Sequence, residues 1–308
     1  MLREVHFLCD EKSAEDFGDL LLDAGAMSVT IEDADRDKPD EVPLYGEPGL
    51  EPQTLAWRRS RLSVLVAEDF DAVTSAAIAA KALGIDLAQV DIAFLSHAHN
   101  DHCGGLLTFL RGNRTAKVYL QKEAFGDYYV VTPTKCAFIG LDPKLHEYAD
   151  RFVMAEGVTK LDEELTLFSG IRTHELLSEA NATLREKVGG DYPRDAFRHE
   201  QDLLVTEHGK TVLFAGCAHS GIINIINRAE DILGRAPDYV FAGFHLYNPS
   251  LGQSEPRALV DAVGERLRAR KATRYVTGHC TGDDAYAWLH ETLGDRLAYM
   301  ATGTTFTI

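Results

Sequence analysis

Residues 96–102, which read Ser-His-Ala-His-Asn-Asp-His, constrain the fold and chemistry of this chain more than any other segment. They place three histidines and one carboxylate directly after an apolar segment, 92–95, that is typical of a buried strand. Histidines two residues apart at a strand end can direct both imidazoles to one ion, and the following Asp101 and His102 can face a second. Imidazole and carboxylate ligands suit zinc, iron or manganese, and an incomplete protein shell leaves room for a reactive water.

This run is an H-x-H-x-D-H motif, and from about residue 80 onward the chain resembles the metallo-β-lactamase-fold hydrolases. Further motifs follow in order: Gly-Cys-Ala-His-Ser-Gly at 216–221, Gly-Phe-His-Leu at 243–246, Gly-His-Cys-Thr-Gly at 278–282 and an expected closing strand at 304–308. The ordered set is similar to one branch, whose members are commonly labelled synthases of a dihydropterin-linked aminobenzene ribosyl phosphate. The resemblance implies an α/β fold with two sheets between outer helices, an αββα sandwich.

The resemblance also implies two divalent ions, with zinc expected and iron or manganese as alternatives. Each ion would have three ligands: His97, His99 and His219 for the first, and Asp101, His102 and His279 for the second. Many relatives have a bridging Asp after the strand that matches 212–215, and Cys217 occupies that place here. A thiolate there would favour zinc, whereas the alternative is a buried, inert cysteine.

Three more side chains are candidates whose roles stay open. His199 and Glu200 precede an expected strand at 203–206, and either could supply a ligand or a hydrogen bond to a ligand. His245 follows an expected strand at 241–244, and it either lines the pocket or is a satisfied core histidine.

The expected chemistry is hydrolysis by a metal-bound hydroxide. Two cations that share a water lower its pKa toward neutrality, and the hydroxide then attacks a carbonyl carbon or a phosphorus. Asp101 is the expected catalytic residue, because it could orient this nucleophile or take its proton. Basic and aromatic residues between the motifs favour a phosphoester or phosphodiester of a small aromatic metabolite: Lys135, Lys144, Arg194, Arg198, Tyr128, Tyr129 and Phe138. A lactone or thioester is the alternative substrate.

The first 75 residues have a different pattern. Alternation and capping signals predict a β-α-β-β-α order, typical of a small ferredoxin-like module: strands at 2–9, 27–32 and 61–67, and helices at 13–23 and 70–83. We therefore expect two domains, 1–75 and 76–308. If the module replaces the opening hairpin of the hydrolase, its strands either fill that place or leave a sheet edge bare.

In detail, this segment resembles the N-terminal substrate-recognition domain of the bacterial methyltransferases that trimethylate the stalk protein of the large ribosomal subunit. The matching stretches are 20–26, 29–34 and 55–61. A divergent start to the hydrolase fold is the alternative. Methyl transfer itself is not expected, because the candidate cofactor turn at 212–219 lacks an acid before its first glycine. The module would at most bind a protein partner, and a non-catalytic fusion is the rival to the hydrolase.

Composition restricts the partners and the compartment. The 308 residues carry a formal net charge of −17 at pH 7, which argues against general binding to nucleic acid or a membrane surface. No apolar run reaches transmembrane length, and the first residues lack the features of a signal peptide. Five cysteines without framework spacing fit a reducing cytoplasm. We expect a cytoplasmic enzyme with a small-molecule substrate, and its oligomeric state stays open.

Overall fold

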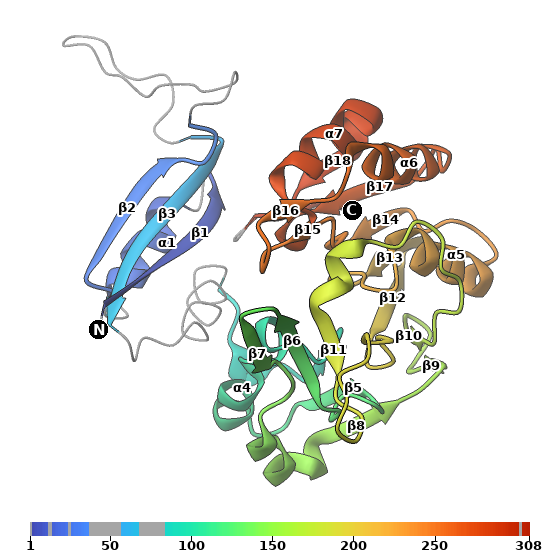
Figure 1. The fold of residues 1–308 in the computed structure, drawn as a ribbon, viewed down its shortest axis with the longest axis horizontal. Coiled ribbons are helices and arrows are strands. Elements are labelled where there is room, and N and C mark those ends of the chain that lie inside the picture. Colours follow the sequence, from blue (N-terminus) through green and yellow to red (C-terminus); the bar gives the residue numbers. More distant parts are fainter. Residues whose placement is uncertain (1, 12–13, 24–25, 37–56, 68–83, 302–303) are drawn as a thin grey trace. The chain divides into compact units, whose positions relative to one another are not determined.

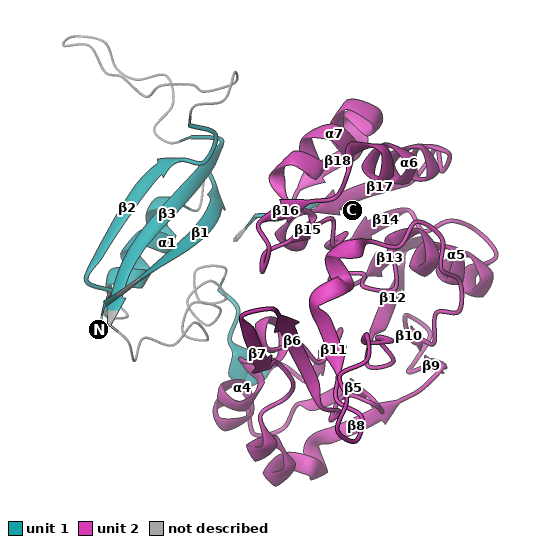
Figure 2. Ribbon diagram, in the orientation of Figure 1, with its two compact units in different colours: residues 1–89, 301–307 teal, residues 90–300, 308 magenta. Residues whose placement is uncertain are grey.

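The computed structural model describes residues 2–11, 14–23, 26–36, 57–67, 84–301 and 304–308 (Figure 1). The chain divides into two compact units (Figure 2): residues 1–89 with 301–307, and residues 90–300 with 308. The domain boundary expected after residue 75 lies outside the described residues, as does the helix expected at 70–83.

The first unit contains a three-stranded antiparallel sheet and one helix. Its strands have the order β1 (Leu2–Asp10), β3 (Arg59–Ala67), β2 (Ser28–Asp33), and α1 (Ala14–Asp23) follows β1 in the chain. Alternate residues of β3 point into the core, which α1 completes through two further apolar side chains: Leu62, Val64, Val66, Phe17 and Leu21. The predicted β-α-β-β order is confirmed for this part of the chain.

The second unit is organised around a seven-stranded sheet with the order β18-β17-β14-β13-β12-β10-β9. Its strands are β9 (Val158–Lys160), β10 (Leu165–Ser169), β12 (Gln201–Glu207), β13 (Lys210–Phe214), β14 (Tyr239–Phe241), β17 (Arg274–Thr277) and β18 (Leu297–Tyr299). The four strands from β13 to β18 run parallel, and the others pair antiparallel.

Three helices pack against this sheet through one hydrophobic core: α5 (Ile222–Leu233), α6 (Arg257–Arg268) and α7 (Asp283–Leu293). On α7, Ala285, Leu289 and Leu293 recur every four residues, so one stripe of the helix is buried. Figure 1 shows α6 and α7 next to β17 and β18.

A second, parallel sheet carries the polar motif. Its order is β4 (Ile92–Phe94), β5 (Lys117–Gln121), β8 (Phe152–Ala155), and it shares a core with α4 (Leu106–Gly112). The Gln201 amide at the start of β12 donates to the carbonyls of Leu95 (2.8 Å) and Tyr119 (2.9 Å), which joins this sheet to the large one.

The remaining elements are short. They are α3 (Asn100–Cys103), β6 (Tyr128–Thr132), β7 (Lys135–Phe138), β11 (Leu184–Glu186), β15 (Tyr247–Asn248), β16 (Gln253–Ser254) and five 3-10 helices at Leu87–Gln89, Pro143–Arg151, Glu179–Thr183, His279–Thr281 and Gly294–Arg296. No helix in the described ranges is long and apolar enough to cross a membrane.

Two sequence expectations need correction. Residues 304–308 form no strand, because strand-like composition alone does not specify a strand. The last strand of the sheet is instead β18, three residues that pair with β17. The strand before His245 ends at Phe241, three residues earlier than expected.

The strands of the first unit form a sheet of their own. In the second unit, β4 lies at the end of its three-stranded sheet, where among the described residues it pairs with β5, and Ile92 on it is 38% exposed.

We expect residues 76–308, expressed alone, to fold. The buried side chains of both cores in the second unit lie between residues 95 and 297, and those of the first unit between 9 and 66. Circular dichroism melting and elemental analysis of the fragment test this, with the full chain as reference. An aggregated fragment beside a soluble full chain would mean that residues 1–75 complete the core.

Candidate metal centre

The H-x-H turn is fixed at the carboxyl end of β4, between the two sheets. The Leu95 N–H still donates to the Tyr119 carbonyl, and the Gln201 N–H donates to the Ser96 carbonyl at 2.8 Å. His99 is the N-cap of α3, so Asp101 and His102 lie in the first turn of that short helix. His97 and His99 thus belong to the turn after the strand, whereas Asp101 and His102 belong to the helix, and the two pairs enter different groups of ligand atoms.

Three imidazoles converge in the interior of the second unit. The ligand atoms of His97, His99 and His219, called the trio below, lie within 4.8 Å of one another. These residues are 0%, 4% and 3% exposed, and the Nε2 atom of each has no hydrogen-bond partner. A buried polar atom without a partner is costly, so three convergent Nε2 atoms fit the first coordination shell of a cation.

The other nitrogen of two trio members is held in place. His97 Nδ1 lies 3.0 Å from Ser96 Oγ, and His219 Nδ1 lies 2.9 Å from Asn181 Oδ1. Burial first, and neighbouring imidazoles second, lower the pKa of His97 and His219 well below the ordinary value. Both rings are therefore neutral at pH 7, the form that binds metals.

A second group lies at the surface. The ligand atoms of Asp101, His102, Cys217 and His279 are within 4.8 Å of one another. Asp101 Oδ2 lies 3.3 Å from His279 Nε2 and 3.5 Å from His102 Nε2, and the Asp101 and His279 side chains are about half exposed. Burial opposes ionisation of Asp101, but the hydrogen bond from His279 and the neighbouring imidazoles outweigh it and hold its pKa at about 2.

Cys217 lies between the two groups. Its Sγ is 3.1 Å from His102 Nε2, and it also belongs to a third cluster with His219 and His245. The thiol is buried, and contact with the Cys280 thiol, followed by burial, raises its pKa well above the ordinary value. Cys217 thus lies next to expected ligands of both ions, His102 and His219.

His199 and Glu200 contact the backbone that carries the trio. The Ala98 N–H donates to His199 Nδ1 at 3.0 Å, and His199 Nε2 lies 3.0 Å from Asp195 Oδ2, so both ring nitrogens are engaged. The two Glu200 oxygens accept the N–H groups of His219 (2.7 Å) and Ser220 (2.9 Å). Both residues therefore support the ligand-bearing turns.

His245 lies against the trio. It is 6% exposed, its ring centroid lies 4.2 Å from that of His219, and neither ring nitrogen has a hydrogen-bond partner. It also has a φ of +47°, and Ala218 and His279 have φ values of +54° and +52°. Backbone strain of this kind is concentrated at functional sites. The strained turns at Ala218, His245 and His279 therefore agree with a functional role for this centre.

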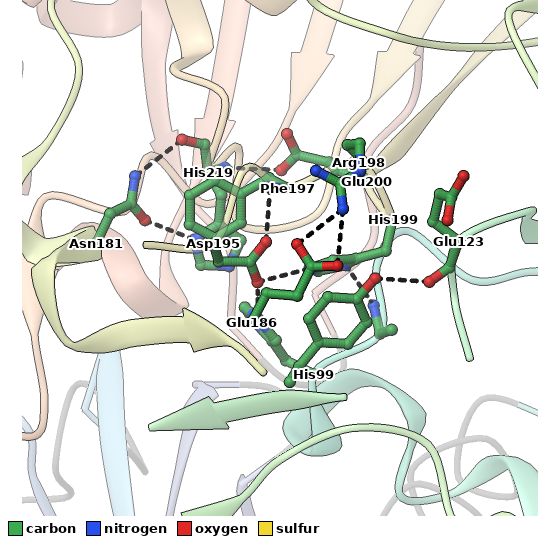
Figure 3. A network of polar contacts seen from close by, with 12 residues as sticks. His99, Glu123, Asn181, Glu186, Asp195, Phe197, Arg198, His199, Glu200 and His219 are labelled. Carbon is green, nitrogen blue, oxygen red and sulfur yellow. Dashed lines mark hydrogen bonds and ion pairs between the residues drawn. The ribbon is translucent and has the colours of Figure 1, made fainter. Parts of the chain in front are cut away.

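The sequence did not indicate three of the residues that contact the imidazoles of this centre. Figure 3 shows Asn181, Asp195 and Phe197 around His99, His199 and His219. Asp195 stands four positions before His199, which is a weak signal, and Asn181 belongs to no motif. Asp195 lies in a loop and Asn181 in the short 3-10 helix Glu179–Thr183, and neither segment has a periodicity that marks a functional position.

We expect Gly216→Ala to disrupt the trio. An added Cβ would lie 2.7 Å from Ser96 Cβ and 2.8 Å from His97 Nδ1, so the His97 ring would have to move. Zinc affinity should fall well below that of the parent, as measured by competition with a chelator. Gly157→Ala is a poor control because of its positive φ, whereas Gly190→Ala meets nothing within 4 Å and should bind zinc as the parent does.

Comparison with known proteins identifies the fold. The sequence profile described as "Metallo-beta-lactamase superfamily" matches residues 69–132. A crystal structure of Tm1679, described as a metal-dependent hydrolase of the beta-lactamase superfamily, covers 76% of this chain and 85% of its own at a TM-score of 0.63 and 23% identity. The chain has the metallo-β-lactamase fold.

A different set of proteins matches about a quarter of the chain. The Ribosomal protein L11 methyltransferase of Cupriavidus taiwanensis is 55% identical over 76 residues, which is 25% of this chain and 26% of that protein. The enzyme of the same name from Paraburkholderia xenovorans is 49% identical over 86 residues, 28% of this chain and 29% of that protein. The chain spans about a quarter of the length of these curated relatives, and it combines parts similar to two kinds of protein.

Proposed function

We propose that the chain is a binuclear metal-dependent hydrolase that acts on a small-molecule ester. The observation that carries the proposal is the trio, whose buried Nε2 atoms have no hydrogen-bond partner, next to the open group around Asp101. The trio would hold one ion, and Asp101, His102 and His279 a second, with Cys217 in reach of both. Bound ions supply an activated hydroxide and stabilise a developing oxyanion.

The protein's own groups orient this chemistry. Ser96 and Asn181 fix two imidazoles through their Nδ1 atoms, which directs the Nε2 atoms inward. Asp101, with half of its side chain exposed, can orient a water or take its proton. The soft sulfur of Cys217 beside imidazoles favours zinc, with iron or manganese as the alternatives.

For the substrate we propose a phosphoester or phosphodiester, in keeping with the branch that makes a dihydropterin-linked aminobenzene ribosyl phosphate. Tyr129 lies 5.5 Å from Phe138 and 5.1 Å from Tyr192 by ring centroids, and Phe138 and Tyr192 are partly exposed, so a planar ring could stack there. Tyr128 does not serve, because it is buried against His199.

Two of the basic residues expected to bind a substrate phosphate are already engaged in ion pairs. Arg194 pairs with Glu179, and Arg198 pairs with Glu186. A substrate phosphate would have to compete with these carboxylates. Lactone or thioester hydrolysis is therefore the second candidate reaction.

A non-catalytic fusion is the second class of function. The match to L11 methyltransferases favours it, because a module of that kind could bind a protein partner through residues 1–75. A non-catalytic fusion of this kind would need no metal-dependent catalysis.

We also propose that the protein is cytoplasmic and has no nucleic-acid or membrane partners. Its five cysteines form no disulfide.

The deciding experiment is purification of the full chain without chelators, followed by elemental analysis. About two zinc, iron or manganese ions per chain support the binuclear hydrolase. The loaded protein is then assayed on bis(p-nitrophenyl) phosphate, on a lactone and on a thioester. A folded, monodisperse chain without metal would reject the hydrolase and leave the non-catalytic fusion.

We expect the second ion to leave first when the pH is lowered. The hydrogen bond to Asp101 raises the pKa of His279 above its ordinary 6.5, so a proton competes for this ligand at mildly acidic pH. The pKa values of His97 and His219 are lowered, so the trio stays neutral to lower pH. Metal content after dialysis at stepped pH measures this, and simultaneous loss of both ions would contradict it.

The same pair affects the metal-free chain. The raised pKa of His279 stabilises the fold below pH 6.5, and this contribution disappears as the pH rises through the raised value. The lowered pKa of Asp101 stabilises the fold above pH 3.8, and this contribution is lost as the pH falls toward about 2. Between these limits both contributions act together, although the half-exposed side chains keep them small.

A further inference from the structure

The carboxylate of Asp195 lies directly behind the trio, although no motif includes it. Asp195 is 7% exposed. Its Oδ1 accepts the Phe197 N–H at 2.7 Å, and its Oδ2 lies 3.0 Å from His199 Nε2 and 3.7 Å from His99 Nε2. One buried carboxylate therefore contacts two imidazoles and one backbone N–H (Figure 3).

The hydrogen bonds define the tautomer of His199. Its Nδ1 accepts the Ala98 N–H at 3.0 Å, so the proton of the neutral ring is on Nε2 and points at Asp195. Ala98 stands between His97 and His99. Two linked hydrogen bonds, from His199 to Asp195 and from the Ala98 N–H to His199, therefore fix the backbone between two trio members.

Asp195 also reaches the third member of the trio. Phe197, whose N–H it accepts, has a φ of +50°, an uncommon value for this residue type. The Phe197 ring stacks on the His219 ring with centroids 4.7 Å apart and an angle of 7° between the planes. The hydrogen bond to Asp195 thus supports the turn that covers His219.

We propose that Asp195 is a positioning residue that orients the three imidazoles of the trio and strengthens their hold on a cation. Three neutral imidazoles leave the charge of a divalent ion uncompensated in a buried site, and a nearby carboxylate offsets it. Asp195 acts through its neighbours and is not a ligand of the trio's ion: it groups with His99 and His199, not with His97 and His219. The inference rests on the proposed metal centre.

Asp195→Asn tests it in the full-length protein. The substitution keeps the size of the side chain, but the new amide nitrogen would face a donor, either the His199 Nε2–H or the Phe197 N–H. Zinc affinity, measured by competition with a chromophoric chelator, should fall about 10- to 100-fold, the loss typical of outer-shell partners. The number of zinc ions bound at saturation should stay that of the parent.

Asp238→Asn is the matched control. Asp238 likewise accepts a backbone N–H, that of Thr211 at 2.7 Å, and pairs with Arg235, but it belongs to no histidine cluster of the described chain. Its substitution should leave zinc affinity unchanged even where it lowers the melting temperature. A general loss of stability would instead weaken zinc binding in both variants.

A second variant, His199→Gln, guards against misfolding of Asp195→Asn. Its amide nitrogen can still donate to Asp195, so its loss of affinity should be smaller, with zinc stoichiometry unchanged. One ion fewer at saturation in either variant, or unchanged affinity in Asp195→Asn, would overturn the inference. A parent that binds no zinc would overturn the proposed function with it, whereas these outcomes in a zinc-binding parent overturn the inference alone.

Discussion

His97→Ala should remove the ion of the trio and lower hydrolysis of the best ester substrate by about 1,000-fold or more. A metal-generated nucleophile and a stabilised oxyanion supply several kcal/mol of transition-state stabilisation, and each 1.4 kcal/mol is about tenfold in rate. His97 is fully buried and its Nε2 has no hydrogen-bond partner, so no solvent molecule replaces it well. His219→Ala should have the same effect.

Elemental analysis and initial rates on the same preparations check this. His290→Ala is the control, because His290 is an exposed residue on α7 that belongs to no histidine cluster of the described chain. It should keep metal and rate at the parent's level. Two ions per chain in both His97→Ala and His219→Ala would show that the trio is not a metal site.

Glu200→Ala should lower the free energy of unfolding by about 2–6 kcal/mol. Glu200 is 3% exposed and accepts two backbone N–H groups, those of His219 and Ser220. Each donor left without a partner costs about 1–3 kcal/mol. Because one of these donors is the backbone of a trio member, zinc affinity should fall as well.

Urea unfolding of the zinc-loaded and chelator-treated proteins separates the two effects. Glu200→Gln should fall between the parent and Glu200→Ala, since its single oxygen can accept only one of the two N–H groups. Glu207→Gln, at the exposed end of the same strand β12, should behave as the parent. Equal losses in Glu207→Gln and Glu200→Ala would reject the role given to Glu200.

The sequence predicted the elements that depend on local patterns. Alternation at 27–32 and a helix-capping serine at position 13 are readable from neighbours in the chain, and both β2 and α1 form where they were expected. The strand expected at 304–308 came from the resemblance instead, and it does not form, because composition does not specify pairing with a strand far away in the chain. β18 was missed for the same reason, since a three-residue strand has too little alternation to detect.

In the site, too, the residues that belong to local sequence motifs were predicted, and those that act through distant contacts were not. The six expected ligands stand in motifs at strand ends, and the structure brings them together in two groups, with Cys217 added to the second. Asp195 and Asn181 act through hydrogen bonds to rings that lie 4 and 38 positions away in the chain. Contacts of this kind depend on loop conformation, which single residues in a sequence do not specify.

The two separate cores also set an order of assembly during synthesis. The core residues described for the first unit lie between residues 9 and 66, so that core can form while most of the chain is still being made, whereas residues 301–307 of the same unit come last. Asp101 and His279 are 178 positions apart, so the second group of ligands cannot close until the ribosome has released His279. An ion that reaches the nascent chain early would therefore meet only the H-x-H-x-D-H segment, and the proposed second site could form only near the end of translation.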